Sequence, residues 1–587
     1  MKISKTLILL ISFQLVIRVP LVNSQTFQWA QRGGLWEYDY GYGISTDNLG
    51  NVFVAGKFEL NAVFGNDTLP NQGNHDIFVA EYSSSGQLKW LHTGGGPSGD
   101  YAHALACDVK INQVFVSGEV QNLLNGPAAR VGTTTIVFPG TPSVTLNAIG
   151  ENDACVMSYN MDGSLLWARN AGGYYDDKAQ AVCYDDSGNV YMAGYFNDTA
   201  YFSSNTTFNN NTLFGNNTTT ITGSNTGLND MFVAKYDKNG NFLWVRQAGG
   251  PGRDEAKGLG CDGAGNVYVC GLYSDGAVFG NLPPFPNTGH YNTFLAKYSP
   301  DGNLQWVRSS LQGPDDNVAW ALTLDKNGLI YVGGEFNASV YFGNNELITN
   351  GMADVFVACY DESGNVLWAT SAGGKEIDRA RGIGTDGTNI YITGQFGDSS
   401  ATSAFGHFNL RSADSSDIFV AELDNAGNFI YAKSVGGPPD SLELLGYESG
   451  NAISADAAGN AYATGSTLQG GIFGNTHLEQ YSRTDFFITK VSPLTTGVNV
   501  MSDDGTGGVR IYPNPANGSF TMDLNNLKNQ KVEISLFNSL GQQVGMEERF
   551  SPGLIGLNLS CANGIYFVVV KTEDQAMYRE KIIIQNQ

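Results

Sequence analysis

The fold is decided by a stretch that recurs along the chain and is clearest at residues 230–244, DMFVAKYDKNGNFLW. It contains a run of strand-forming residues from Asp230 to Tyr236, a turn with Gly240, and a second apolar run that ends at Trp244. Two such runs around a tight Gly-Asn turn are typical of a β-hairpin.

The Trp that closes this hairpin recurs at regular intervals. Six Trp residues share the position and a Tyr takes the seventh place: Trp29, Trp90, Trp167, Trp244, Trp306, Trp368 and Tyr431. Neighbouring positions differ by 61, 77, 77, 62, 62 and 63 residues. A period near 60 with strand-like content indicates propeller blades or another β array.

Each unit contains four expected strands. After the Trp comes a Gly-Gly loop, as at residues 172–173, and then a strand of small and apolar residues, as at 179–183. A tight turn at 185–189 leads to a second strand at 190–194. A variable loop that often contains Phe-Gly-Asn then precedes the hairpin. Four antiparallel strands, repeated seven times, predict an all-β, seven-bladed propeller.

Ring closure is also readable from the chain. The seventh unit ends at residues 485–490 and lacks the fourth strand that ends in Trp. Residues 26–29, before the first unit, match that missing strand. We therefore expect the N-terminal strand to complete the last blade, which leaves no open sheet edge.

The units resemble the seven-bladed β-propeller repeat family of secreted bacterial proteins over about residues 26–492. The resemblance is carried by the D-x-x-G-N-V-Y-V-x-G run at 262–271 and the D-x-F-V-A-K-Y run at 230–236. It implies the fold and leaves the function open, because propellers host unrelated activities.

A different pattern follows a Gly/Ser/Thr/Asp linker at residues 495–509. Short alternating strands at 532–537, 556–559, 566–571 and 581–584 predict a small antiparallel β-sandwich over 510–587. This part closely resembles the type A C-terminal sorting domain of the type IX secretion system. The motif residues that carry the resemblance are Tyr512, Pro513, Asn514, Pro515, Gly541, Gly564, Tyr566 and Lys581. The resemblance implies that the secretion machinery is a partner, and that the protein is exported to the cell surface or released.

The N-terminus has the pattern of a secretory signal peptide over residues 1–24. Lys2 and Lys5 precede a short apolar run at 7–17, and Val22 and Ser24 fit a cut before Gln25. The propeller is then expected over 25–494. No later stretch is apolar enough to cross a membrane, so we expect no transmembrane segment after signal removal.

The net charge and the cysteine spacing argue against several classes of partner and site. The chain has 587 residues and a formal net charge of −24, which argues against nucleic acid as a partner. Its seven Cys residues are widely spaced and contain no C-x-x-C pair. Cys107, Cys183 and Cys261 share one repeat position, and we expect them to be buried small residues rather than a disulfide framework.

No catalytic motif stands out. The sequence contains no H-E-x-x-H, no G-x-S-x-G nucleophile elbow and no Walker loop. Catalytic residues are therefore not assigned, and we expect the protein not to be an enzyme.

Successive strands of a blade run in opposite directions, so the connections between strands fall on two opposite faces of the ring. The connections between blades and those between second and third strands share one side, which we call the loop face; the hairpin turns share the other. The two longest units carry their additional residues on the loop face, around 121–152 and 197–229. Variable loops on a rigid scaffold are the usual place for binding, so we expect the site there.

One acidic position repeats at the start of the innermost strands and is expected to ring the channel mouth: Asp39, Asp100, Asp177, Asp254, Asn317, Asp378 and Glu448. Two interpretations stay open. Each carboxylate accepts backbone N–H bonds from its own Gly-Gly loop, or the ring binds Ca²⁺ or Mg²⁺. We expect no other cofactor.

A second repeating position, inside the same strands, is polar or aromatic and different in every blade: Tyr42, His103, Gln180, Lys257, Trp320, Arg381 and Asn451. These residues are candidate ligand contacts along the channel; the alternative is packing between blades. The sequence predicts a non-catalytic binding or adhesion scaffold for a glycan or a surface protein. The alternative is a secreted hydrolase or lyase that acts on polysaccharide from the loop face.

Overall fold

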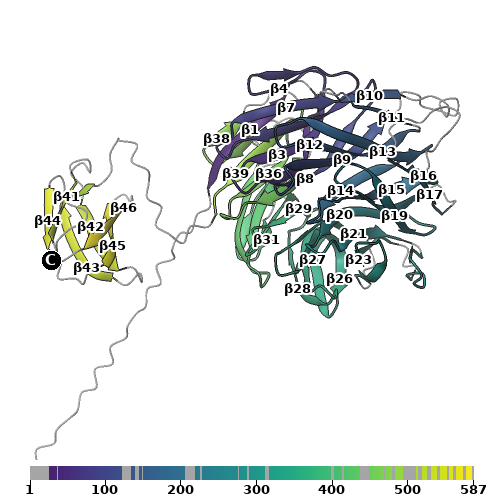
Figure 1. Ribbon diagram of the computed structural model, residues 1–587. Coiled ribbons are helices and arrows are strands. Elements are labelled where there is room, and N and C mark those ends of the chain that lie inside the picture. The colour runs from purple at the N-terminus through teal and green to yellow at the C-terminus, as the bar shows by residue number, and fades with distance from the viewer. Residues whose placement is uncertain are drawn as a thin grey trace, which may run out of the picture. The chain divides into compact units, whose positions relative to one another are not determined.

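The computed structural model describes residues 26–35, 37–121, 134–138, 144–148, 150–204, 218–224, 228–274, 276–286, 290–310, 316–397, 402–412, 416–436, 448–468, 470–478 and 483–493 in the first part of the chain, and 510–512, 519–524, 531–538, 543–550, 554–558, 564–572 and 577–584 in the second (Figure 1). The regular structure in these residues is all β-strand. The chain divides into two compact units at Pro493/Leu494. The predicted signal segment 1–24 and linker 495–509 lie outside the described residues.

The first unit is a ring of seven antiparallel blades, as predicted. The first three blades are formed by β2 (Tyr40–Thr46), β3 (Val52–Glu59), β6 (His75–Tyr82) and β7 (Leu88–Gly94); β8 (Tyr101–Asp108), β9 (Gln113–Gln121), β12 (Asn152–Asn160) and β13 (Leu165–Gly173); and β14 (Lys178–Tyr184), β15 (Val190–Asn197), β18 (Asn229–Tyr236) and β19 (Phe242–Gly249).

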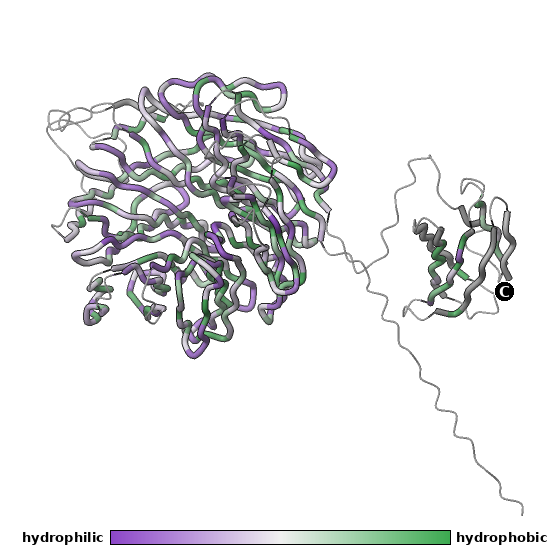
Figure 2. The backbone as a smooth tube through the Cα atoms, turned by 180° about the vertical axis from the view of Figure 1, so that it is seen from behind, coloured by the Kyte–Doolittle hydropathy of each residue, from purple (hydrophilic) through white to green (hydrophobic). Residues whose placement is uncertain are grey.

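The next three blades repeat this order. They are formed by β20 (Glu255–Cys261), β21 (Val267–Tyr273), β23 (Asn292–Tyr298) and β24 (Leu304–Ser309); β25 (Asn317–Leu324), β26 (Ile330–Phe342), β27 (Asn345–Tyr360) and β28 (Val366–Ala372); and β29 (Arg379–Thr385), β30 (Ile390–Phe396), β33 (Asp417–Leu423) and β34 (Phe429–Val435). Figure 2 shows hydrophobic segments within the blades, in keeping with strands buried between neighbouring sheets.

The seventh blade closes the ring with the N-terminal strand, which confirms the prediction. It contains β35 (Ser449–Ala455), β36 (Ala461–Thr467), β39 (Asp485–Val491) and β1 (Phe27–Gly34). β1 pairs antiparallel with β39, with Trp29 opposite Lys490 and Gly33 opposite Phe486. The two ends of the ring are thus joined by backbone hydrogen bonds.

The recurring Trp links each blade to the next. Its indole Nε1–H donates to a carbonyl in the turn between the third and fourth strands of the following blade, at 2.9–3.2 Å in six blades. Trp90, for example, donates to the carbonyl of Met161. The blade that follows Tyr431 is the seventh, whose fourth strand comes from the N-terminus, so it has no such turn. This explains why the seventh position lacks the indole.

Small hairpins fill the variable loops. Their strands are β4 (Ala62–Phe64), β5 (Asp67–Leu69), β10 (Thr134–Phe138), β11 (Val144–Ala148), β16 (Thr199–Phe202), β17 (Thr219–Thr222), β31 (Ser403–Phe405), β32 (Phe408–Leu410), β37 (Gly471–Phe473) and β38 (Thr476–Leu478). In the fourth blade the loop instead carries the short strand β22 (Val278–Phe279), which pairs with β19. In six blades a Phe of this loop packs on a Phe of the third strand, with centroids 4.6–5.1 Å apart. The Phe-Gly-Asn motif is therefore a packing element.

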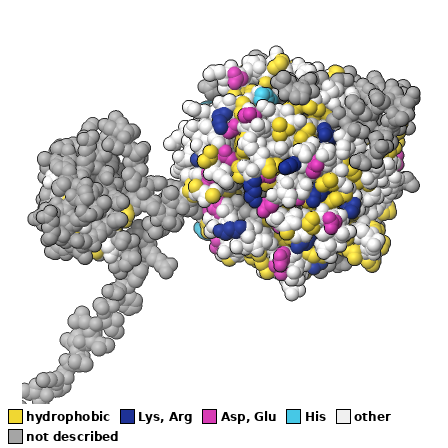
Figure 3. All heavy atoms as spheres, in the orientation of Figure 1, with side chains coloured by type: hydrophobic (Ala, Val, Ile, Leu, Met, Phe, Trp, Pro, Cys, Tyr) yellow, Lys and Arg dark blue, Asp and Glu magenta, His cyan; other side chains and the backbone are white. Residues whose placement is uncertain are grey.

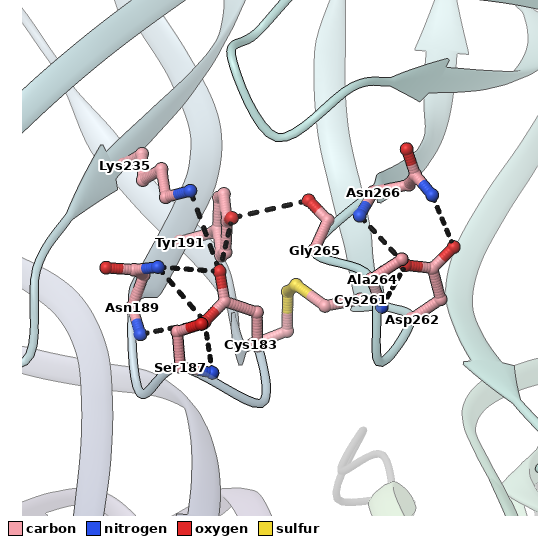
Figure 4. The surroundings of a disulfide bond; sticks show 11 residues. Cys183, Ser187, Asn189, Tyr191, Lys235, Cys261, Asp262, Ala264, Gly265 and Asn266 are labelled. Carbon is pink, nitrogen blue, oxygen red and sulfur yellow. Dashed lines mark hydrogen bonds and ion pairs between the residues drawn. A yellow bond between two sulfur atoms is a disulfide. The ribbon is translucent and has the colours of Figure 1, made fainter.

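The expectation for the cysteines was wrong. Cys183 at the end of β14 and Cys261 at the end of β20 form a disulfide, which joins the innermost strands of the third and fourth blades (Figure 4). Equivalent positions in adjacent blades lie side by side near the axis, here with Cα atoms 6.1 Å apart. A separation of 78 residues in the chain therefore does not prevent pairing. Cys107 is buried and free, as expected.

The second unit contains two antiparallel sheets. One is formed by β40 (Arg510–Tyr512), β41 (Ser519–Asp523) and β44 (Leu554–Asn558), the other by β42 (Lys531–Asn538), β43 (Gln543–Phe550), β45 (Gly564–Thr572) and β46 (Met577–Ile584). Phe520 and Met522 of the first sheet share one buried cluster with Val532, Ile534 and Val568 of the second. This is the predicted small sandwich.

Candidate functional site

A β-bulge interrupts the innermost strand of every blade. Where this strand pairs with the second strand, the register skips one residue, for example between Gly41 and Gly43 in β2. The skipped residues are Tyr42, His103, Gln180, Lys257, Trp320, Arg381 and Asn451. A bulge leaves its extra residue unpaired and re-aims the side chain. The seven candidate contacts are thus the seven bulged residues.

All seven side chains line one cavity of about 350 Å³ on the axis of the ring. Below them lies a ring of small residues, such as Gly43, Gly258 and Gly382. A Cβ added at Gly43 would lie 2.5 Å from the backbone N of Leu105 in the next blade. The small residues therefore let neighbouring innermost strands approach closely enough to form a continuous wall.

The floor of the cavity was not predicted. It is an aliphatic ring, with one residue from each blade: Ile44, Leu105, Val182, Leu259, Leu322, Ile383 and Ile453. The recurrence of a branched aliphatic residue at one repeat position was the signal that could have identified it. This ring gives the cavity an apolar base beneath a polar and aromatic mouth.

The wall formed by the first two blades is aromatic. Tyr40 and Tyr42 are stacked, with centroids 5.6 Å apart, and so are Tyr101 and His103, at 6.0 Å. Tyr42 and His103 meet at 5.7 Å between centroids. The ammonium group of Lys57 lies 5.0 Å from the rings of both Tyr40 and Tyr101. These contacts hold the aromatic side chains in place.

The opposite wall, from the fourth to sixth blades, is cationic. Trp320 has the Lys257 ammonium 5.1 Å and the Arg381 guanidinium 5.2 Å from its ring. Lys257 forms an ion pair with Glu255 at 2.6 Å. Burial lowers the pKa of Lys257, and Glu255 opposes that shift. Burial also raises the pKa of Tyr42, against the nearby positive charge of Arg381.

The two amide residues complete the ring. Asn451 donates a 2.9 Å hydrogen bond to the carbonyl of Gly41, which bridges the seventh and first blades. The Oε1 atom of Gln180 is buried and has no hydrogen-bond partner in the described part of the chain. It is therefore an acceptor that the described fold does not use, on a residue that lines the cavity.

The polar side chains at the start of the innermost strands accept hydrogen bonds from nearby backbone. Four of them accept from the loop that precedes the strand, and Asp39, Asn317 and Glu448 accept from the residue 20 positions further along the chain. Asp100 accepts bonds from the Gly96 N–H (2.7 Å) and the Gln121 N–H (3.0 Å). Six equivalent residues also accept a backbone N–H: Asp39, Asp177, Asp254, Asn317, Asp378 and Glu448. This geometry suits the capping interpretation.

Cation binding by these carboxylates stays a prediction. Burial raises the pKa of Asp39 to about 8 and that of Asp100 and Asp378 to about 7, against the backbone bonds that lower it. Within the described ranges, no group of three or more His, Cys, Asp or Glu side chains is arranged to hold a metal ion. At six of the seven positions the carboxyl is already engaged with backbone, and at the seventh the residue is an amide, Asn317.

The sorting-motif residues fall on the second unit. Tyr512 ends β40, Gly564 begins β45, and Tyr566 and Lys581 lie in β45 and β46. Tyr566 pairs with Ile582, and Lys581 pairs with Phe567, so both motifs meet in one ladder. Pro513, Asn514, Pro515 and Gly541 lie outside the described residues.

Family models match both units. Residues 510–585 match the secretion system C-terminal sorting domain, and residues 28–57 and 243–280 match the β-propeller repeat. Curated relatives include an uncharacterized WD repeat-containing protein, L264, of Acanthamoeba polyphaga mimivirus, and the regulatory protein FlaEY of Caulobacter vibrioides. Both are 29% identical over 40% of this chain, which spans only 19% and 23% of their lengths.

Solved structures overlap only weakly. A Synechocystis apocarotenoid oxygenase mutant gives a TM-score of 0.28 at 10% identity, over 59% of this chain and 64% of that chain. A DUF4221 family member from Bacteroides vulgatus gives a TM-score of 0.27 at 10% identity, over 63% of this chain and 92% of that one. Scores this low carry no argument about the site.

The sorting domain indicates export through the periplasm to the cell surface or the medium, and it implies contact with the secretion machinery. Among the residues that the structure describes, no helix is long and apolar enough to span a membrane. The chain thus combines a seven-bladed propeller built from the β-propeller repeat with a C-terminal sorting domain of the type IX secretion system.

Proposed function

We propose that this exported propeller is a non-catalytic binding protein that takes a saccharide at the loop-face end of its central channel. The observation that carries the proposal is the convergence of seven bulged residues, different in every blade, on one cavity of about 350 Å³. A scaffold needs only the small and aliphatic rings to close. The varied polar ring above them is therefore free to serve recognition.

The chemistry of the cavity favours a sugar. Tyr42, His103 and Trp320 supply aromatic surface, while Gln180 and Asn451 supply amide groups. Apolar surface with a few placed polar groups is the usual composition of a small-ligand site. The cavity volume is at the low end of such sites, about 300–1,000 Å³, and suits a sugar unit better than a folded partner.

The electrostatics of the wall favour binding over catalysis. The carboxylate of Glu119 lies 3.0 Å from the Lys178 ammonium and 3.7 Å from Nε2 of His103. Although burial raises the pKa of Glu119, His103 and Lys178 more than offset it, and the pKa falls below its usual range. A general acid needs the opposite shift. Glu119 is therefore suited to hold cations in place.

Binding is tested with the full chain against a panel of neutral and acidic oligosaccharides. We expect saturable binding that Tyr42→Ala weakens at least tenfold, because an aromatic contact at the cavity wall is lost. Tyr174→Ala is the matched control, since Tyr174 is an exposed aromatic residue outside the cavity. Absence of saccharide binding, or equal losses in both variants, would refute the proposal.

A polysaccharide hydrolase or lyase is the second candidate. It is favoured by Tyr42 and His103, which line one cavity, and by the buried carboxylate of Glu119, which lies 3.7 Å from Nε2 of His103. Incubation with the bound polysaccharide distinguishes the two functions. New reducing ends or unsaturated products that His103→Ala abolishes would establish catalysis, and unchanged polymer would support binding alone.

A further inference from the structure

A second cavity of about 320 Å³ lies beside the channel where the fourth, fifth and sixth blades begin. It shares Lys257 and Trp320 with the channel, so the two cavities adjoin at the cationic wall. Leu272 and Val318 provide apolar lining, and Tyr291 provides an aromatic ring. A ligand seated in the channel could therefore extend into this space.

Positive charge is in excess around Trp320. Arg253 and Lys257 share one carboxylate, Glu255, and Arg379 pairs with Glu335. Arg381 completes a set of four cations that face two buried or half-buried carboxylates. Asp316 is the third carboxylate of the lining, but its side chain is 50% exposed at the rim and lies 3.7 Å from Nδ1 of His290.

The cations on the rest of the ring near the channel are each paired with a carboxylate. On the other side of the ring, Lys57 pairs with Glu59, and Lys178 pairs with Glu119 and Asp176. The outer surface drawn in Figure 3 also intersperses Lys and Arg with Asp and Glu. Among the described residues around the two cavities, the excess of positive charge lies in the fourth to sixth blades, in a protein whose formal net charge is −24.

The cation without a carboxylate is Arg381. Its Nε–H is buried and has no hydrogen-bond partner in the described part of the chain. Its terminal nitrogen makes one long contact, 3.5 Å, to Oε1 of Gln395. A desolvated guanidinium with an unused donor is costly in an empty site, and a bound anion would offset that cost. The fold itself does not need this charge, since the equivalent residue is an amide or an aromatic in every other blade except the fourth, where it is Lys257.

We propose that the second cavity, together with the cationic wall that it shares with the channel, is a subsite for an acidic sugar residue, whose carboxylate or sulfate group is held at that wall by Arg381, which lines the channel, and Lys257, which lines both cavities. The ring of that residue would lie against the apolar and aromatic lining. This inference rests on the proposed saccharide binding and adds the charge class of the ligand. Both anionic groups offer the planar or tripodal oxygens that guanidinium and ammonium groups recognise.

The test compares an oligouronate with the same oligosaccharide after its carboxyl groups are reduced to alcohols, by calorimetry on the full chain. We expect the oligouronate to bind at least tenfold more tightly, and the preference to fall as sodium chloride is raised. A sulfated oligosaccharide of equal length serves as a third ligand and distinguishes the two anionic groups. Equal affinity for the acidic and reduced forms would overturn the subsite while leaving saccharide binding intact.

Two variants locate the anion. Arg381→Gln and Lys257→Met should each abolish most of the preference for the acidic ligand, with little change in affinity for the reduced one. Lys326→Gln, in a hairpin turn on the opposite face, removes the same charge and should change neither affinity. Arg381→Gln should also leave the melting temperature unchanged or raised, because an uncompensated buried charge is removed. A variant that keeps its full preference for the acidic ligand would refute the assignment.

Discussion

The buried carboxyl at the start of an innermost strand should make the stability of the propeller depend on pH in an unusual direction. Asp100 is fully buried, and burial raises its pKa to about 7, with a smaller contribution from Asp76; bonds from Gln121 and Gly96 oppose the shift. The folded state therefore binds this proton more tightly than the unfolded state. Its contribution is favourable at acidic pH and is lost as pH rises through about 7.

The size of the effect follows from the shift. A rise from the ordinary aspartate pKa of 3.8 to about 7 is about three pKa units, and at ~1.4 kcal/mol per unit it corresponds to about 4 kcal/mol. Asp100→Asn removes the titration but gives up one of the two accepted N–H bonds, at a cost of about 1–3 kcal/mol at every pH. The variant should be less stable than the natural protein at pH ~4 and more stable at pH ~9.

The assay is urea unfolding followed by Trp fluorescence at both pH values. The fifth blade offers a reverse control, because the equivalent residue is already an amide, Asn317, which accepts the N–H of Asn337. Asn317→Asp should lower stability at the alkaline pH and leave it nearly unchanged at the acidic one. If Asp100→Asn shifts the midpoint by the same amount at both pH values, the carboxyl does not carry a raised pKa and the reasoning is wrong.

Three further predictions concern the frame of the ring. Reduction of the disulfide, or Cys183→Ala, should lower the melting temperature, because the link closes 78 residues and is worth ~4 kcal/mol by chain entropy; Cys183→Ala should then be insensitive to reductant, whereas Cys107→Ala, which removes a buried free thiol and keeps the disulfide, should still lose stability on reduction. Trp90→Phe should cost ~1 kcal/mol through loss of its bond to Met161, whereas Tyr431→Phe should cost nothing, because the Tyr431 hydroxyl is buried without a partner in the described structure; equal urea midpoints would contradict the role of the indole. Deletion of residues 26–34 should expose the edge of β39 and cause aggregation on size exclusion, and a monodisperse product would contradict closure by β1.

The sequence by itself determined the number of blades, their strand order and the closing strand. These features follow from local hairpin chemistry, such as the turn at Gly240, repeated often enough to be counted. It also identified the seven channel residues, because a position that varies while its neighbours stay small or aliphatic stands out in a repeat. The acidic position was found for the same reason, and its pattern favoured capping while leaving cation binding as the alternative.

Only the tertiary structure decided which residues meet across blades. The bulge at Tyr42 and its equivalents, the disulfide between Cys183 and Cys261, and the bond from Trp90 to Met161 all join strands far apart along the chain. The excess of positive charge around Trp320 likewise combines side chains from three blades. Such contacts depend on how closely neighbouring sheets approach at the axis. The local pattern of apolar and polar residues does not predict that distance.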